Sequence, residues 1–142
     1  MNTADLYDRD FAEWAIRNAE LLRSGRVAEA DLDHIAEEIE DLAKRERRAT
    51  ESRLARLIQQ LLEWQVQPMK RCASWQSTIA EQRFRIFKLL KENPSFRPEL
   101  ANWIDDEHEH LATLDTGFER ERFPSSWPYT VEQTLDQGFL PG

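Results

Sequence analysis

The residues best suited to chemistry are Glu107 and His110, which stand three positions apart in the run Glu-His-Glu-His. In a helix this spacing puts a carboxylate and an imidazole on one face, as in bundles that hold two bridged metal ions. A complete site of that kind needs a second such pair and two further carboxylates. The remaining histidine, His34, precedes Glu37 in the reverse order. A metal site built from Glu107, His110 and an acidic residue such as Glu38 is therefore an alternative to our preferred interpretation, a solvated acidic face.

Other motifs of enzyme active sites are missing from the sequence. There is no glycine-rich phosphate loop, no nucleophile elbow and no Cys-x-x-Cys pair. The single cysteine, Cys72, has no histidine near it in the chain, and the carboxylates of residues 37–41 have no identifiable nucleophile beside them. We therefore expect a protein without enzymatic activity and without a cofactor.

The segment around Pro68 carries a different kind of candidate site. Two tryptophans bracket the proline, with Lys70 and Arg71 between them. Aromatic and cationic side chains together are typical of recognition surfaces, and packing of the tryptophans in a core is the alternative. The predicted binding residues are Trp64, Gln65, Pro68, Arg71, Trp75, Gln82 and Arg83.

The elements that position these residues are expected to be helices. Glycine is rare, at 4 in 142 residues, and no stretch alternates apolar and polar residues as a strand does. We predict an all-α fold in a single domain, residues 1–142. It is a four-helix-type bundle over about residues 5–122 with a long second helix, and a C-terminal tail, about 123–142, packs on it. The predicted helices cover residues 6–24, 75–92 and 95–117, with a further turn over 118–122 left open, and a short helix covers 131–136. The long second helix is expected to begin after Asp31 or Asp33 and to end before Pro68.

Capping residues support these boundaries. Acidic or hydroxyl side chains before a helix accept its free N–H groups, and glycine after a helix supplies the left-handed residue that ends it. Proline ends a helix that precedes it. The expected signals are N-caps at Asp5, at Asp31 or Asp33 and at Ser74, a stop at Gly25 and at Pro68, and a capping box formed by Thr130 and Gln133.

The second predicted helix is long for a chain of this size. Its apolar stripe begins with Leu32, Ile35, Ile39 and Leu42, at alternating spacings of three and four, and thins to small and charged residues between 43 and 53. About 34 helical residues would span about 50 Å. Such a helix projects beyond the bundle, kinks near the thin segment, or packs against a second copy.

Charge is segregated along the chain, although the total is −8. Residues 1–43 carry 4 basic and 12 acidic groups, residues 44–91 carry 12 and 4, and residues 92–142 carry 3 and 11. Packing of antiparallel helices would neutralise these blocks against each other, which is our first interpretation. A basic face over Arg45–Arg56 presented to nucleic acid is the alternative, but the overall acidity opposes it.

Several compartments are disfavoured by the same composition. A membrane span needs about 18 consecutive apolar residues, and no apolar run in the sequence approaches this length. The first residues do not resemble a signal peptide. A single cysteine forms no internal disulfide, as is usual in a reducing compartment. We expect a cytoplasmic protein that does not enter the membrane.

The most specific pattern runs from EEIEDL through LLEWQVQP to SWQSTIAEQR, with YDRDFAEWA before it and FPSSWPYTVEQTLDQGF after it. In this combination the chain, from Tyr7 to Pro141, resembles the bacterial domain of unknown function 29 family. The resemblance implies a small all-helical bundle and no established activity, ligand or catalytic residue. In that family a histidine often stands where this chain has Gln60, and the Glu107–His110 run is not part of its pattern.

The absence of catalytic motifs, the long helix and the segregated charge together favour a non-enzymatic protein–protein interaction module. A homodimer in which the long helices cross is one form of it, since the acidic half of one helix can face the basic half of another. The alternatives are a metal-dependent bundle enzyme at Glu107 and His110, and a nucleic-acid-linked regulator using the basic central segment.

Overall fold

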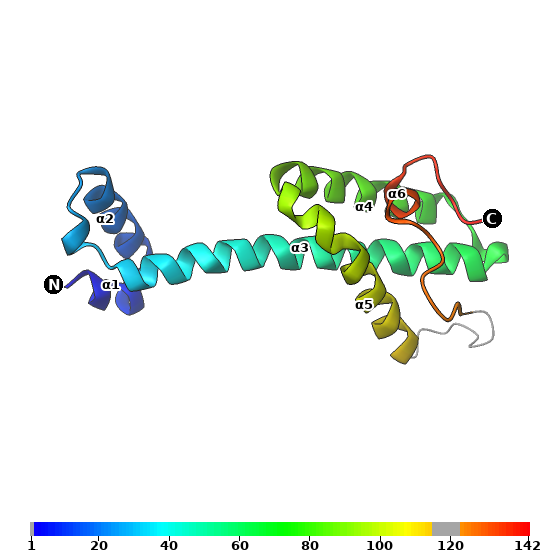
Figure 1. Ribbon diagram of the computed structural model, residues 1–142, viewed down its shortest axis with the longest axis horizontal. Coiled ribbons are helices and arrows are strands. Elements are labelled where there is room, and N and C mark those ends of the chain that lie inside the picture. The colour runs from blue at the N-terminus through cyan, green and yellow to red at the C-terminus, as the bar shows by residue number, and fades with distance from the viewer. Residues whose placement is uncertain (1, 115–122) are drawn as a thin grey trace. The chain divides into compact units, whose positions relative to one another are not determined.

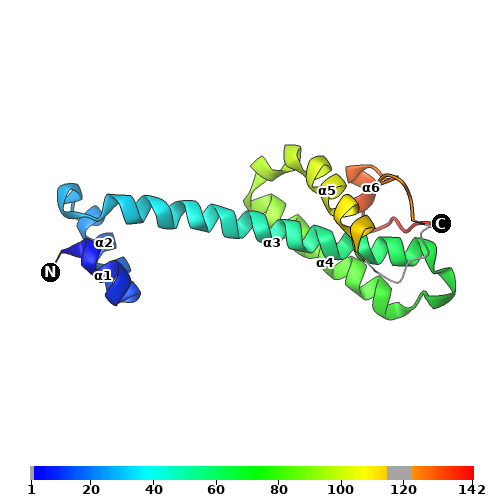
Figure 2. The ribbon, with the colours of Figure 1, turned by 90° about the horizontal axis from the view of Figure 1, so that it is seen from below.

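The computed structural model describes residues 2–114 and 123–142, and every regular element formed by these residues is helical (Figures 1 and 2). The all-α class is therefore confirmed. The α-helices are α1 (Thr3–Arg9), α2 (Phe11–Arg23), α3 (Leu32–Val66), α4 (Ala73–Glu92), α5 (Leu100–Thr113) and α6 (Val131–Leu135). Short 3₁₀ helices join them: η1 (Val27–Glu29), η2 (Pro68–Lys70) and η3 (Pro94–Glu99).

The first helix differs from the prediction, because residues 6–24 are divided between α1 and α2 at Asp10. This residue has an extended backbone, with φ −153° and ψ 92°. Its N–H donates to the Leu6 carbonyl at the end of α1, and its carboxylate accepts from the Glu13 N–H at the start of α2. One residue thus satisfies two helix ends. The expected cap at Asp5 is wrong, since Asn2 holds that position, and the expected stop at Gly25 is confirmed by its φ of 78°.

The long helix is present as a single element of 35 residues, α3. It ends two residues before Pro68, as predicted from the steric restriction that proline puts on the residue before it. Neither α3 nor any other helix within residues 2–114 and 123–142 combines the length and apolar character needed to cross a membrane.

The contacts of the chain group into two compact units, the N-terminal unit (Met1–Arg45) and the C-terminal unit (Glu46–Gly142). The first part of α3 belongs to the N-terminal unit, and its remainder belongs to the C-terminal unit. Each unit has its own helices and its own buried residues. The single-domain organisation stays a prediction.

In the C-terminal unit, α4 runs alongside the second part of α3 and α5 crosses it obliquely (Figures 1 and 2). The α3 leucines and isoleucine at the centre of this core have no exposed surface. Four half-buried residues of the tail pack against the same core, so the predicted packing of the tail is confirmed: Phe123, Trp127, Val131 and Leu135. The core residues are Leu54, Leu57, Ile58, Leu61, Leu62, Trp64, Ile79, Ile86, Leu90, Leu100, Trp103, Ile104 and Leu111.

The helix ends of the C-terminal unit follow the predictions with small shifts. α4 begins at Ala73 without a side-chain cap, so the expected cap at Ser74 is wrong. The fourth predicted helix is the 3₁₀ helix η3 followed by α5, and its expected continuation over 115–122 lies outside the described residues. The capping box before α6 is confirmed, because Thr130 and Gln133 exchange two hydrogen bonds of 3.0 Å.

Candidate functional site

The predicted binding residues around Pro68 lie at η2, where α3 ends and α4 begins. Trp64 is 8% exposed, and the guanidinium carbon of Arg71 lies 4.9 Å from the centroid of the Trp64 ring. Arg71 Nε also donates to the Trp64 carbonyl at 2.7 Å. Pro68 is exposed, and Trp75 is half-buried against the core. The structure thus brings the aromatic and the basic side chain together but covers most of the Trp64 ring.

The C-terminal tail of the same chain contacts this corner. Trp64 Nε1 donates to the Pro141 carbonyl at 3.1 Å, and Arg71 Nη2 donates to the Gly142 carbonyl oxygen at 2.9 Å. The Tyr129 hydroxyl donates to Gln65 Oε1. Three of the predicted binding residues therefore hold the tail against the end of α3.

Arg83 anchors the tail from α4. Its side chain is buried and donates to three carbonyls, those of Thr134 at 2.8 Å, Phe139 at 2.7 Å and Gln133 at 3.3 Å. Two of these carbonyls belong to the last turn of α6, where no further helical N–H is available to them. Burial lowers the pKa of the Arg83 guanidinium, and the Asp136 carboxylate opposes this effect. Arg83 is therefore a structural anchor.

Gln82, beside it in sequence, is also buried, and its Oε1 accepts from Arg53 Nη1 at 3.3 Å. The predicted binding residues of the corner thus make contacts within the C-terminal unit. Binding of another protein by these residues stays a prediction.

The residues of the alternative metal site fall in different units. Glu107 and His110 lie near the end of α5, and Glu38 lies on the first part of α3. Burial raises the pKa of the Glu107 carboxyl, and the charge of His110 opposes this. Within residues 2–114 and 123–142, no three side chains of histidine, cysteine, aspartate or glutamate come together as a metal ion would require.

His108 is the buried histidine of this run, which the sequence analysis missed. It is 4% exposed, and its ring centroid lies 5.0 Å from that of Phe123 and 6.1 Å from that of Trp127. Burial lowers the pKa of the imidazole, a hydrogen bond with the Pro124 backbone opposes this, and Nε2 has no hydrogen-bond partner. Its position four residues after the buried Ile104 was the available signal. The His108 ring on α5 therefore packs against aromatic side chains of the tail.

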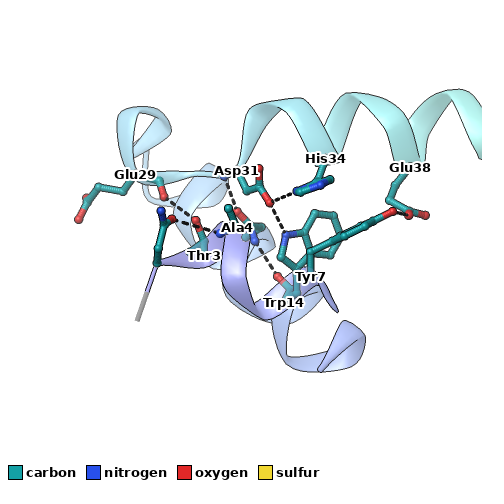
Figure 3. Close-up of polar contacts among 10 residues, drawn as sticks. Thr3, Ala4, Tyr7, Trp14, Glu29, Asp31, His34 and Glu38 are labelled. Atoms are coloured by element: carbon teal, nitrogen blue, oxygen red, sulfur yellow. Dashed lines mark hydrogen bonds and ion pairs between the residues drawn. The ribbon is translucent and has the colours of Figure 1, made fainter. Parts of the chain in front are cut away.

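The N-terminal unit contains a cluster of polar and aromatic side chains that the sequence analysis did not predict (Figure 3). Asp31 Oδ2 accepts from Trp14 Nε1 at 2.9 Å and lies 2.6 Å from His34 Nδ1. The Tyr7 ring stacks on the His34 imidazole with a centroid distance of 3.9 Å, and its hydroxyl donates to Glu38. These contacts tie α1 and α2 to the start of α3.

Asn18 and the cap of α3 complete this cluster. The buried Asn18 accepts from the Asp31 N–H and donates to the Trp14 carbonyl, both at 2.8 Å. The His34 backbone N–H also hydrogen-bonds the Asp31 carboxyl, so of the two expected caps, Asp31 and Asp33, the first is the one that caps this helix. Asp31 therefore serves both as helix cap and as the centre of the cluster.

The electrostatics of the cluster follow from these contacts. Burial raises the pKa of the Asp31 carboxyl, but hydrogen bonds from Trp14 and His34 outweigh it and lower the pKa. The hydrogen bond to Asp31 raises the pKa of His34, and the bond to Glu38 raises that of Tyr7 to about 12. A carboxylate that orients an imidazole also occurs in hydrolases, where a nucleophile must lie within hydrogen-bond reach. Here the imidazole contacts the Asp31 carboxylate on one side and stacks on the Tyr7 ring, and both contacts join helices of the N-terminal unit.

The apolar side chains on the first part of α3 lie outside this cluster. Leu32, Ile39 and Leu42 are 49%, 61% and 58% exposed. Their spacing puts them on one face of the helix, and we call them the α3 stripe. Phe11 and Ile16 of α2 are also more than half exposed. Scattered exposed apolar residues are ordinary, but a row of them along one helix face is typical of a contact surface.

Comparison with known proteins gives a family but no better-characterised relative. No curated protein and no solved structure matches the chain. A family model described as the domain of unknown function DUF29 matches residues 6–140, which is nearly the whole chain. The resemblance noted in the sequence is thereby confirmed, and the chain belongs to the DUF29 family.

Proposed function

We propose that this chain is a non-enzymatic protein–protein interaction module whose contact surface is the α3 stripe. The observation that carries the proposal is a contrast within one helix. In the second part of α3 the apolar residues Leu54, Leu57 and Leu61 are fully buried, whereas Ile39 and Leu42 in the first part are more than half exposed. Exposed apolar surface of this kind is stabilised when another surface covers it.

The magnitudes support such a role. Full burial of a leucine or isoleucine side chain stabilises a complex by about 1.5–3 kcal/mol, and the α3 stripe residues still have roughly half of that to gain. Contributions from both partners are needed to offset the freedom lost on association. The α3 stripe therefore suits a contact that also uses charged residues beside it.

A photo-crosslinking side chain tests this proposal directly. It is placed at Ile39 or Leu42 in the full chain within cells, and at Ser52 as a control, an exposed polar position on the same helix. We expect crosslinked species from positions 39 and 42 but few from position 52. Equal crosslinking at all three positions, or none at positions 39 and 42, would contradict an interaction surface at the α3 stripe.

The proposal includes a cytoplasmic location. It is supported by Cys72, whose thiol is free and exposed, because reducing compartments preserve such thiols. Treatment of intact cells with a thiol reagent that does not cross membranes tests it. We expect Cys72 to stay unmodified until the cells are opened, and labelling of Cys72 in intact cells would contradict a cytoplasmic location.

A nucleic-acid-linked role is the second candidate, favoured by the exposure of basic side chains on α3. Lys44, Arg45, Arg48 and Arg56 are exposed, whereas Arg47 is paired with Glu51 at 3.0 Å. Binding of a labelled RNA or DNA strand, measured at increasing salt, tests it. Phosphate contacts predict a steep loss of affinity with salt, and the absence of binding at low salt would exclude this role.

A further inference from the structure

We infer that the partner that covers the α3 stripe is a second copy of this chain, with the first parts of the two α3 helices antiparallel. The inference rests on the proposed function and names its partner. It is carried by three features of residues 32–45: the heptad spacing of the apolar side chains, the order of the charges, and the small residues beside the stripe.

The spacing of the α3 stripe, taken with the half-buried Ile35, matches the seam of a coiled coil. Leu32 and Ile39 fall seven residues apart at one seam position, and Ile35 and Leu42 fall seven apart at the other. In an antiparallel pair each side chain of the first kind faces one of the second kind. A two-fold axis between residues 40 and 41 puts Ile39 against Leu42 of the partner subunit. The two symmetric central contacts are thus made by four apolar side chains that are exposed in the single chain, and Leu32 faces Ala49 of the partner subunit.

The order of the charges selects a second copy in this orientation. Glu38 and Arg45 fall seven residues apart on the same flank of the α3 stripe. In the antiparallel pair Glu38 lies beside Arg45 of the partner subunit, and symmetry makes this contact twice. A parallel pair instead aligns the acidic run Glu37–Asp41 with itself, which is repulsive. The charges along this part of α3 are thus complementary to the same charges on an antiparallel second copy.

The other flank of the α3 stripe permits close approach. Ala36 and Ala43 occupy it, and both are exposed. Small side chains at a helix contact allow short interaxial distances. Tyr7 of the N-terminal helices reaches Glu38 through Oε1, which leaves Oε2 for Arg45 of the partner subunit, and Ile39 lies about 100° further around the helix axis than Glu38. The cluster that holds α1 and α2 therefore stays intact in the dimer.

Disulfide trapping tests both the partner and the orientation. The native thiol is first removed with Cys72→Ser, and Ile39→Cys and Leu42→Cys are made as separate chains. In the antiparallel pair residues 39 and 42 lie opposite each other, whereas two copies of residue 39 are offset by about 4.5 Å along the axis. We expect the oxidised mixture to form a covalent dimer that contains one chain of each kind, several-fold more abundant than the dimer from either chain alone. Preferential crosslinking of Ile39→Cys with itself would overturn the inference, because a parallel pair gives that result.

Charge reversal provides a second measurement that does not depend on cysteines. Arg45→Glu should weaken dimerisation on the order of tenfold, because both symmetric contacts become repulsive. Glu38→Arg should do the same, and because it also removes the acceptor of the Tyr7 hydroxyl, circular dichroism first verifies that this variant stays folded. The double variant should recover most of this loss. Arg48→Glu, which changes an exposed charge away from the α3 stripe, serves as the matched control and should have little effect. Equal effects at 45 and 48, or no recovery in the double variant, would overturn the pairing.

Failure of this inference can be separated from failure of the proposed function. If the chain stays monomeric while positions 39 and 42 crosslink to another protein in cells, the second copy is excluded and the interaction surface stands. If neither position crosslinks to any protein, the proposed function fails as well.

Discussion

The interactions that stabilise the interior of each unit differ between the two units of this molecule. In the C-terminal unit, thirteen buried apolar residues from α3, α4 and α5 form one core. In the N-terminal unit, hydrogen bonds and ring contacts around Asp31 join the helices, and among its apolar side chains Trp14 is the buried one within the described residues. The N-terminal unit therefore keeps apolar side chains at its surface that its own fold does not use. Phe84 and Phe87 of the C-terminal unit are also more than half exposed, and we assign the interaction surface to the N-terminal unit because its exposed apolar side chains form a row along α3.

The largest expected effect contrasts the two parts of α3. Leu61→Ala removes a fully buried side chain and should lower the free energy of unfolding by about 3 kcal/mol. Leu42→Ala removes an exposed one and should change it by less than about 0.5 kcal/mol in dilute solution. Urea unfolding followed by circular dichroism measures both. Similar losses for the two variants would mean that Leu42 is buried within the single chain, and the contrast would not hold.

The next effect concerns the anchor of the tail. Arg83→Met keeps the bulk of the side chain but removes the donors to three carbonyls, so the C-terminal unit should lose about 2 kcal/mol of stability. Amide hydrogen exchange in α6 should accelerate. The control is Arg85→Met, which removes an exposed ion pair to Glu81 and should cost less than about 0.5 kcal/mol. If the amides of α6 exchange at the same rate in both variants, Arg83 does not hold the tail.

A smaller effect is expected in the N-terminal unit. Asp31→Ala removes the helix cap and the acceptor of Trp14 Nε1, and should destabilise the unit by about 1 kcal/mol. Faster amide exchange in α1 and α2, with unchanged exchange in α5, is the expected observation. Asp33→Ala, an exposed acidic residue in the same helical turn, is the matched control. Exchange that accelerates equally in both variants would point to loss of charge rather than loss of the cluster.

The smallest effect, a pH dependence, has opposite signs in the two units. The pKa of His34 is raised from 6.5. Its contribution to the stability of the N-terminal unit is therefore complete below pH 6.5 and is lost as the pH rises through the raised value. The pKa of His108 is lowered from 6.5, so its neutral ring contributes above pH 6.5 and the contribution is lost as the pH falls through that range. As the pH rises, the N-terminal unit should weaken and the C-terminal unit should strengthen.

Hydrogen exchange at several pH values, corrected for the intrinsic rate, measures both slopes. His34→Gln should flatten the first slope and His108→Gln the second. Slopes of the same sign in both units would show that these histidines do not control the pH dependence.

The sequence predicted most helices because their signals are local. The limits of α3, the stop at Gly25 and the capping box at Thr130 depend on residues a few positions apart. The break at Asp10 was missed because the flanking residues continue to favour a helix. The break is favoured by the Asp10 backbone N–H, which serves the end of α1, and by its carboxylate, which serves the start of α2.

The site was harder to predict because its contacts are distant in sequence. Trp64 and Pro141 lie 77 residues apart, and nothing near Trp64 indicates that the tail covers it. The helical period of the apolar residues correctly groups Leu32, Ile39 and Leu42 on one face. It does not distinguish a face that is buried within the chain from one that is left for a partner, and that difference became visible through the exposure of these side chains.

The most direct test of the central claim is the solution mass of the chain over a wide concentration range, measured by sedimentation equilibrium for the wild type and for Ile39→Glu. Ile39 is 61% exposed, so the substitution should leave the fold unchanged, as circular dichroism can verify. The account predicts that the wild type reaches twice the monomer mass as concentration rises and that Ile39→Glu stays monomeric. A wild type that stays monomeric at every concentration, or a variant that dimerises equally well, would contradict it.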